Sequence, residues 1–243
     1  LVGSEMCIRD RVVMDEQFNS AVTDIFRNEY LSPRSPYTTL QIPKQGIGEW
    51  CHPLHTVDID DSGLRSSVQK GVLNTKLGVP FRTPAEGQNI AFTSLWDNYP
   101  DSLTVSLKGK ASRAYLLMAG STNHMQCHID NGLIRVYYKD GTCDKMALRN
   151  PDNWAPIEHI FFEDGLAFNR HAPALYRLRL KTGEISNNFG EELGFPGASR
   201  ELDGGAAILL EMPLNPDKKL SHLVLETLSN DVVIGLMGIT LQR

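Results

Sequence analysis

Two runs of strand-like sequence between residues 103 and 141 constrain this chain most. Residues 103–108 alternate apolar and polar side chains, the period-two pattern of a strand with one face in solvent. Residues 113–119 are apolar at both alternations, which is typical of a central strand between two layers. Turn signals at residues 130–132 (Asp-Asn-Gly) and 140–141 (Asp-Gly) bracket a further strand. This region therefore predicts antiparallel β-structure.

The same pattern continues to the C-terminus, with strand-like runs at 206–214, 220–228 and 232–241. An earlier run predicts that Tyr176, Leu178 and Leu180 face inward and that Arg177, Arg179 and Lys181 face solvent. Short strands between frequent turns indicate an all-β fold, and we expect an antiparallel β-sandwich (jelly roll) over residues 71–243. Its core is predicted to include Tyr115, Leu117, Val136, Leu178, Leu210, Leu225 and Ile234.

The N-terminal part follows a different pattern. Residues 15–30 place Phe18, Val22, Ile25 and Phe26 at helical spacing, which predicts a short amphipathic helix. An irregular junction loop, which includes residues 45–61, follows. We interpret residues 12–70 as the helix and linker remnant of an upstream domain.

Residues 1–11 resemble translated sequencing-adapter read-through and are excluded from the fold prediction as an artefactual tail. A segment that was not selected together with this fold has no reason to complement it. We therefore expect residues 1–11 to be disordered or unpacked.

Bulk properties exclude several classes of function. The formal net charge is -5, so no excess of positive charge indicates a nucleic-acid-binding protein. No apolar run approaches the roughly 20 residues of a membrane span. No Gly-rich phosphate loop or nucleophile elbow occurs, so no cofactor is predicted. Outside residues 1–11, three scattered cysteines do not make a disulfide framework.

Two loops combine a tryptophan with amide and carboxylate side chains, a composition suited to sugars. An apolar ring can stack on the C–H face of a sugar while polar groups bind its hydroxyls. Alternatively, both rings plug the end of the sandwich and the polar residues serve turns. The candidate ligand-binding residues are Trp96, Asp97, Asn98, Tyr99, Asn153, Trp154, Arg170 and His171, with Trp96 expected to expose its ring.

Histidine and cysteine cluster at two places, Cys51/His52/His55 and His124/Cys127/His128. Each cluster offers three of the four usual zinc ligands, and on a strand Cys127 and His128 would point to opposite faces, so we predict no metal site. Residues 58–63 match the opening of a calcium loop, but Gln69 occupies the position of the bidentate Glu. A solvated turn explains this segment better.

Catalysis has weak support. Hydrolysis of a glycoside needs two carboxylates across a cleft, and the sequence shows no such pair. Glu163-Asp164 reads as part of a turn, and Glu49 in the junction loop is the remaining candidate.

Several segments resemble a known type of domain. Residues 78–81 and 107–120 are similar to the opening of galactose-binding-like jelly rolls, and residues 218–225 and 231–241 to their last strand pair. Residues 26–65 resemble an uncharacterised family of large bacterial glycan-degrading proteins.

The resemblance implies an accessory carbohydrate-binding or structural-support domain, C-terminal to a glycoside-hydrolase-like catalytic domain of the same chain. A glycan and that catalytic domain would be its partners, in the periplasm or outside the cell. Two alternatives stay open. The chain could be part of a glycoside hydrolase whose active site includes the 45–61 loop, or a structural domain without a ligand.

Overall fold

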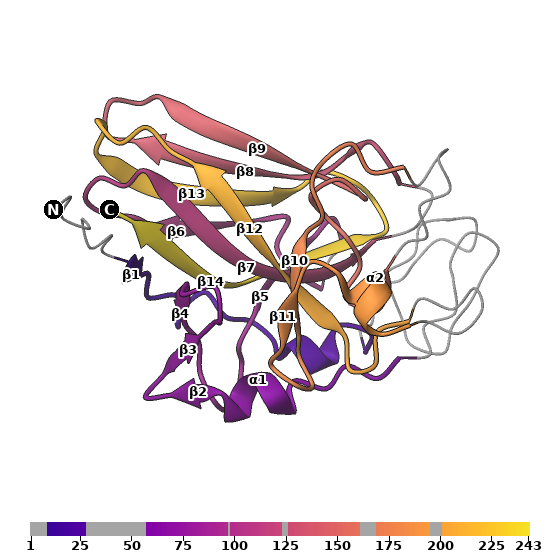
Figure 1. The fold of residues 1–243 in the computed structure, drawn as a ribbon. Helices are drawn as coiled ribbons and strands as arrows, with labels where there is room; N and C mark the ends of the chain where they lie inside the picture. Colours follow the sequence, from indigo (N-terminus) through magenta and orange to yellow (C-terminus); the bar gives the residue numbers. More distant parts are fainter. Residues whose placement is uncertain (1–8, 28–56, 97, 123–125, 161–168, 195–200) are drawn as a thin grey trace, which may run out of the picture.

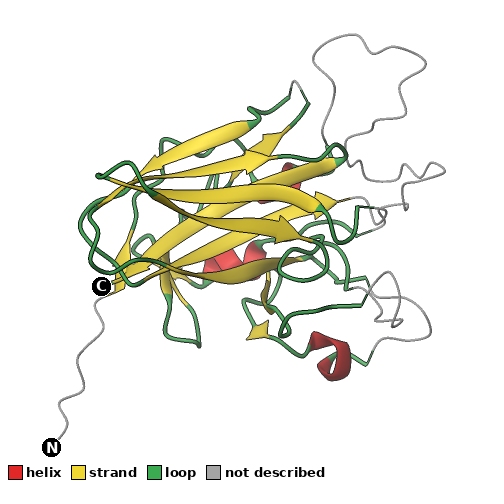
Figure 2. Cartoon of the chain, turned by 90° about the horizontal axis from the view of Figure 1, so that it is seen from above, coloured by secondary structure: helices red, strands yellow, loops and turns green. Residues whose placement is uncertain are grey.

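The computed structural model describes residues 9–27, 57–96, 98–122, 126–160, 169–194 and 201–243. Strands are the main regular secondary structure of this part, and the helices in it are short (Figure 2). These helices are η1 (Val22–Asp24), α1 (Ser62–Ser66) and α2 (Phe189–Glu192). The chain is therefore an all-β sandwich of antiparallel sheets, as the sequence predicts.

The larger sheet carries the strands that begin and end the described chain. Its order is β1 (Arg9–Arg11), β14 (Val232–Gln242), β7 (Arg113–Thr122), β12 (Ala206–Pro213), β10 (Tyr176–Arg179) and β11 (Ile185–Ser186). In addition, β5 (Ala91–Ser94) pairs with β14.

The second sheet lies above the first (Figure 1). Its order is β6 (Ser102–Ser106), β13 (Leu220–Thr227), β8 (Asp130–Tyr138) and β9 (Cys143–Arg149). A small sheet of β2 (Val68–Gln69), β3 (Val72–Asn74) and β4 (Pro80–Arg82) lies on the far side of the large sheet, beside α1 (Figure 1).

Strand β7 is the centre of the sandwich, paired on one side with β14 and on the other with β12. Ala114, Leu116 and Met118 belong to the apolar cluster between the two large sheets. Tyr115 and Leu117 belong to a second cluster on the opposite face. Both alternations are thus buried, which confirms the prediction of a central strand between two layers.

The predicted core is confirmed. All seven predicted residues are buried, and they are divided between the two apolar clusters on either side of the large sheet. The strand runs predicted after residue 200 correspond to β12, β13 and β14 within two residues at each end.

The predicted helix over residues 15–30 is wrong in its described part, residues 15–27, where the only helical element is the single turn η1. Contacts with a distant part of the chain explain why no helix forms here. The side chain of Asn19 both donates to and accepts from the backbone of Phe92, at 3.0 and 2.9 Å. Ser20 forms a bridge with Ile90. This segment therefore extends the sheet beside β5, although its apolar residues are buried as expected.

The boundary expected at residue 71 does not separate two packed units in the described residues. Val22, Ile25 and Leu64 share one apolar cluster with Phe81 and Leu117. Residues from both described parts of the 12–70 range therefore cover the outer face of the large sheet.

The expectation that residues 1–11 are unpacked is wrong for Arg9–Arg11. These residues form β1, which pairs with the last residues of β14. The carboxylate of Asp10 also accepts from the guanidinium of Arg243 at 2.5 Å. Residues 1–8 lie outside the described part.

The outward orientation predicted for Arg177 is wrong as well. Its guanidinium is buried and donates to the carbonyl oxygens of Pro156 (2.6 Å), His159 (2.7 Å) and Ala206 (3.1 Å). Burial lowers the pKa of Arg177 to about 10, and the nearby Glu158 carboxylate opposes this shift. Arg177 therefore stays charged at neutral pH and binds residues 156–159 to the large sheet. Tyr176, expected to face inward, is instead exposed.

No helix in the described ranges is long and apolar enough to cross a membrane.

The burial of Leu225 gives a direct test of the fold. Leu225→Ala removes a fully buried side chain from the cluster between the sheets and should lower the free energy of unfolding by roughly 2–5 kcal/mol. Leu228→Ala, three residues later and 40% exposed, should change it by about 0.5 kcal/mol or less. Urea unfolding of both variants provides the measurement, and equal losses would contradict this packing.

Candidate functional site

The loops that carry the candidate residues meet at one end of the sandwich, on the right of Figure 1. The backbone of Thr227 donates to Asp101, and that of Leu228 donates to Asn131. Residues 149–154 lie beside them, because the backbone of His128 donates to Asn150. We refer to residues 95–101, 126–131, 149–160, 169–175 and 228–231 as the loop end.

The Trp96 loop contributes to packing more than to an open surface. The Trp96 ring is 5% exposed, so the expectation of a solvent-presented ring is wrong. Tyr99 packs on Phe92 with ring centroids 5.1 Å apart, and burial raises the pKa of its phenol. The side chain of Asn98 accepts from Ser94 within the same loop. Asp97 lies outside the described residues.

Trp154 is fully buried and anchors the second loop. A Cβ added at Gly120 would lie 2.7 Å from two atoms of the Trp154 ring, so strand β7 and the ring are in close contact. Asn153 donates to the carbonyl of Ala147 at 2.8 Å and accepts from the backbone of Arg149 at 2.7 Å. Both residues therefore fix the shape of the loop, in agreement with the alternative that the tryptophans plug the end of the sandwich.

The loop that Trp154 anchors presents Asp152 to two histidines. The Nδ1 atom of His128 lies 3.7 Å from one carboxylate oxygen, and the Nδ1 atom of His171 lies 3.8 Å from the other. The two imidazole rings are 4.8 Å apart between centroids and tilted by 38°. One ligand atom from each of the three residues falls in a group within 4.8 Å of one another. We refer to His128, Asp152 and His171 as the His–Asp–His cluster.

Backbone contacts hold the three residues of this cluster in place. Cys127 forms a parallel bridge with Asn150, and the His128 backbone N–H donates to the Asn150 carbonyl at 2.7 Å. The backbone N–H of His171 donates to the Asp152 carboxylate, also at 2.7 Å. His128 itself has a φ of 55°, a left-handed conformation that is uncommon for a side chain of this size. The fold thus brings together residues from three separate loops.

The cluster also contains an unsatisfied group. The Nε2 atom of His128 is buried and has no hydrogen-bond partner. The separation of its Nδ1 atom from Asp152 is beyond hydrogen-bonding distance. Buried polar groups are normally hydrogen-bonded, so the Nε2 atom is an exception among the described residues.

Sequence reasoning found the parts of this site but not their combination. His171 was selected as a ligand-binding residue and His128 as part of a rejected zinc cluster. Asp152, which precedes Asn153 in the second tryptophan loop, is not among the predicted site residues. The sequence signal was a histidine or carboxylate beside each of three turns, and pairing those turns required the strand order. His124, the cluster Cys51/His52/His55 and Glu49 lie outside the described residues.

The segment that resembles a calcium loop forms a turn and the start of α1. Hydrogen bonds from the side chain of Ser62 and from its backbone N–H, the latter at 2.9 Å, lower the pKa of the Asp60 carboxyl. The buried Asp61 carboxylate accepts from Asn89 and Arg65, both at 2.8 Å. The carboxylates therefore satisfy protein donors, as a structural turn requires.

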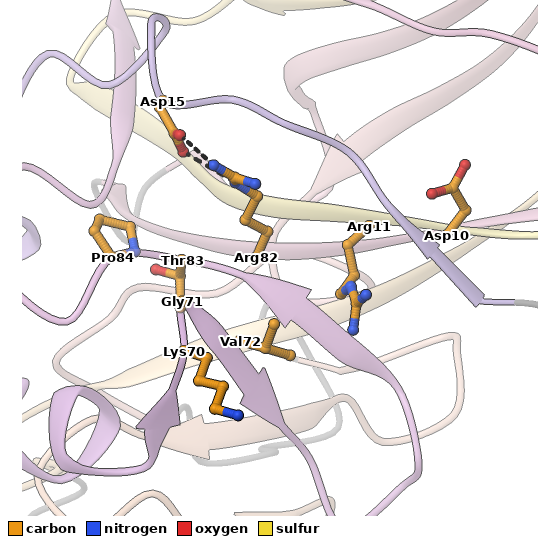
Figure 3. A pocket seen from close by; sticks show the side chains of 9 residues that line it. All are labelled: Asp10, Arg11, Asp15, Lys70, Gly71, Val72, Arg82, Thr83 and Pro84. Atoms are coloured by element: carbon orange, nitrogen blue, oxygen red, sulfur yellow. Dashed lines mark hydrogen bonds and ion pairs between the residues drawn. The ribbon is translucent and has the colours of Figure 1, made fainter.

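A pocket of about 470 Å³ lies elsewhere, between β1 and the small sheet (Figure 3). Arg82 crosses it to pair with Asp15 at 2.7 Å, and Lys70 lies opposite. Asp10 and Arg11 form part of its wall. Because these two residues belong to the segment that resembles adapter sequence, we assign no function to this pocket.

Comparisons of the chain with family models, with curated proteins and with solved structures gave no match.

The anchoring role of Trp154 leads to a stability prediction. Trp154→Ala should lower the free energy of unfolding by about 3–5 kcal/mol, because a fully buried ring is removed. Tyr176→Ala, which removes a 40% exposed ring at the start of β10, should cost about 0.5 kcal/mol or less. Thermal and urea unfolding measure both. A loss for Trp154→Ala no larger than that for Tyr176→Ala would contradict the anchoring role.

Proposed function

We propose that this chain contains an accessory glycan-binding domain of a glycan-degrading protein and that the loop end is its binding surface. The single observation that carries the proposal is the His–Asp–His cluster, where a carboxylate and two imidazoles lie beside the exposed side chain of Ile129. Such groups donate to and accept from sugar hydroxyls, while the apolar side chain offers a surface for C–H groups. Arg170, next to His171 in the chain, adds a cationic donor.

The strand order supports the jelly-roll part of this proposal. The order β5–β14–β7–β12 in one sheet faces β6–β13–β8–β9 in the other. Two interleaved Greek keys of four strands each produce this arrangement. The likeness to galactose-binding-like domains rests on the sequence segments described above and on this order.

Recognition in this proposal is polar and does not use tryptophan stacking. Each hydrogen bond to a charged group contributes about 1.5–3 kcal/mol, so a few such contacts give weak binding. Attachment to a catalytic domain would raise retention on a polymeric substrate through effective concentration. The proposed role is therefore to hold the enzyme on its glycan, in a periplasmic or extracellular setting.

Calorimetric titration of the whole chain against plant and host oligosaccharides, with EDTA throughout, tests the proposal. We expect saturable binding to at least one glycan. His171→Ala and Arg170→Ala should each weaken it by about tenfold or more, because each removes a charged or polar contact. Lys218→Ala, in the β12–β13 turn at the opposite end, should leave the affinity unchanged. No saturable binding, or binding that all three variants retain, would contradict glycan recognition at the loop end.

A structural domain without a ligand is the second candidate. The burial of both Trp96 and Trp154 favours it, because it removes the stacking surfaces that a sugar would use. Failure of every glycan in the titration would support this alternative.

A further inference from the structure

We propose that His128, Asp152 and His171 bind a single divalent transition ion of the zinc class. This site does not depend on glycan binding. The proposal rests on two observations: the convergence of three ligand atoms and the space between them.

The separations fit an ion that lies between the side chains. At 3.7 and 3.8 Å, the two nitrogen–oxygen distances are too long for hydrogen bonds and too short for unrelated groups. A tetrahedral ion with bonds of about 2.0–2.1 Å would hold its ligand atoms about 3.3 Å apart. The two nitrogen–oxygen distances, at 3.7 and 3.8 Å, are about 0.4–0.5 Å longer than this spacing.

The two ring nitrogens of His128 have different parts in this site. The Nδ1 atom lies 3.7 Å from the Asp152 carboxylate, so it is the atom that would coordinate the ion. The buried Nε2 atom would then carry the ring proton.

The carboxylate is positioned as a ligand would be. Asp152 accepts the backbone N–H of His171 at 2.7 Å, and such second contacts orient metal-binding carboxylates. This hydrogen bond also holds the His171 backbone next to the carboxylate, so that two of the three ligands are fixed together. His171 is 65% exposed in its side chain, which gives an ion access from solvent.

The donor set selects the class of ion. Imidazole nitrogen suits zinc, copper, iron and nickel, whereas calcium and magnesium take oxygen ligands. Two histidines and one carboxylate leave at least one coordination position open, unlike the closed sites of structural zinc. That position would accept water or an oxygen atom of a ligand.

The test uses the whole chain, stripped with EDTA and dialysed into metal-free buffer. Calorimetric titration with ZnCl2 should give one saturable equivalent, and CaCl2 and MgCl2 should give none. Titration with CoCl2 should produce the visible absorption of low-coordinate cobalt, which reports coordination directly. No glycan is present, so this result is independent of the proposed function.

Asp152→Asn is the sharpest variant, because the amide oxygen can still accept the His171 N–H while the charge is lost. Asp152→Asn and His171→Ala should each weaken zinc binding by about 10–100-fold or more, because loss of a group that only orients a metal ligand already has an effect of that size. His222→Ala, a histidine on β13 that stacks on Tyr137, should not change it. Urea midpoints in EDTA should be equal for all variants, which shows that they fold.

Absence of saturable zinc binding would overturn the proposal. So would a zinc affinity that Asp152→Asn and His171→Ala leave intact, because the ion would then be bound by other donors, such as the thiols of Cys127 or Cys143. Zinc binding without any glycan binding would leave this site standing and refute only the proposed function. Glycan binding without zinc binding would refute only the metal site.

Discussion

The pairing of β7 with its two neighbours is the interaction on which the rest of the structure depends. Ten residues of β7 pair with β14 and six of them also pair with β12. The side chains of residues 114–119 enter the apolar clusters on the two faces. An unpaired backbone group in such a place would be costly, so the register of this strand is strongly determined. The second sheet and the N-terminal segments are both layers placed against this strand and its neighbours.

The loop end shows how a rigid interior can position polar groups at its surface. Trp154 packs on β7 and fixes the turn that carries Asp152. Arg177 holds residues 156–159 through their carbonyl oxygens, and Ser121 donates to the buried carboxylate of Glu158 at 3.0 Å. The His–Asp–His cluster, in which His171 is exposed and the other two residues are half-buried, thus rests on a packed layer. Tryptophan has a structural role here, and the ligand chemistry belongs to its neighbours.

The sequence was informative where side-chain periodicity decides the structure. The double alternation of residues 113–119 identified the central strand, because only burial on both faces accounts for it. Periodicity failed for residues 15–27, where apolar residues at helical spacing are buried by an irregular segment that Asn19 attaches to Phe92. It also failed for Arg177, because alternation cannot reveal three carbonyl oxygens contributed by distant loops. The His–Asp–His cluster was missed for the same reason.

The contact between β1 and β14 shows how the first described residues are held against the large sheet. Arg9–Arg11 pair with Thr240–Gln242 through the backbone, and their side chains are mostly exposed. Main-chain hydrogen bonds of this kind do not depend on the identity of the side chains, as in strand addition to an open sheet edge. Side chains add to this pairing, because Asp10 binds Arg243 and Arg9 donates to the carbonyl of Leu77. The edge of β14 therefore accepts an extended segment through its backbone, and two side chains of that segment add contacts of their own.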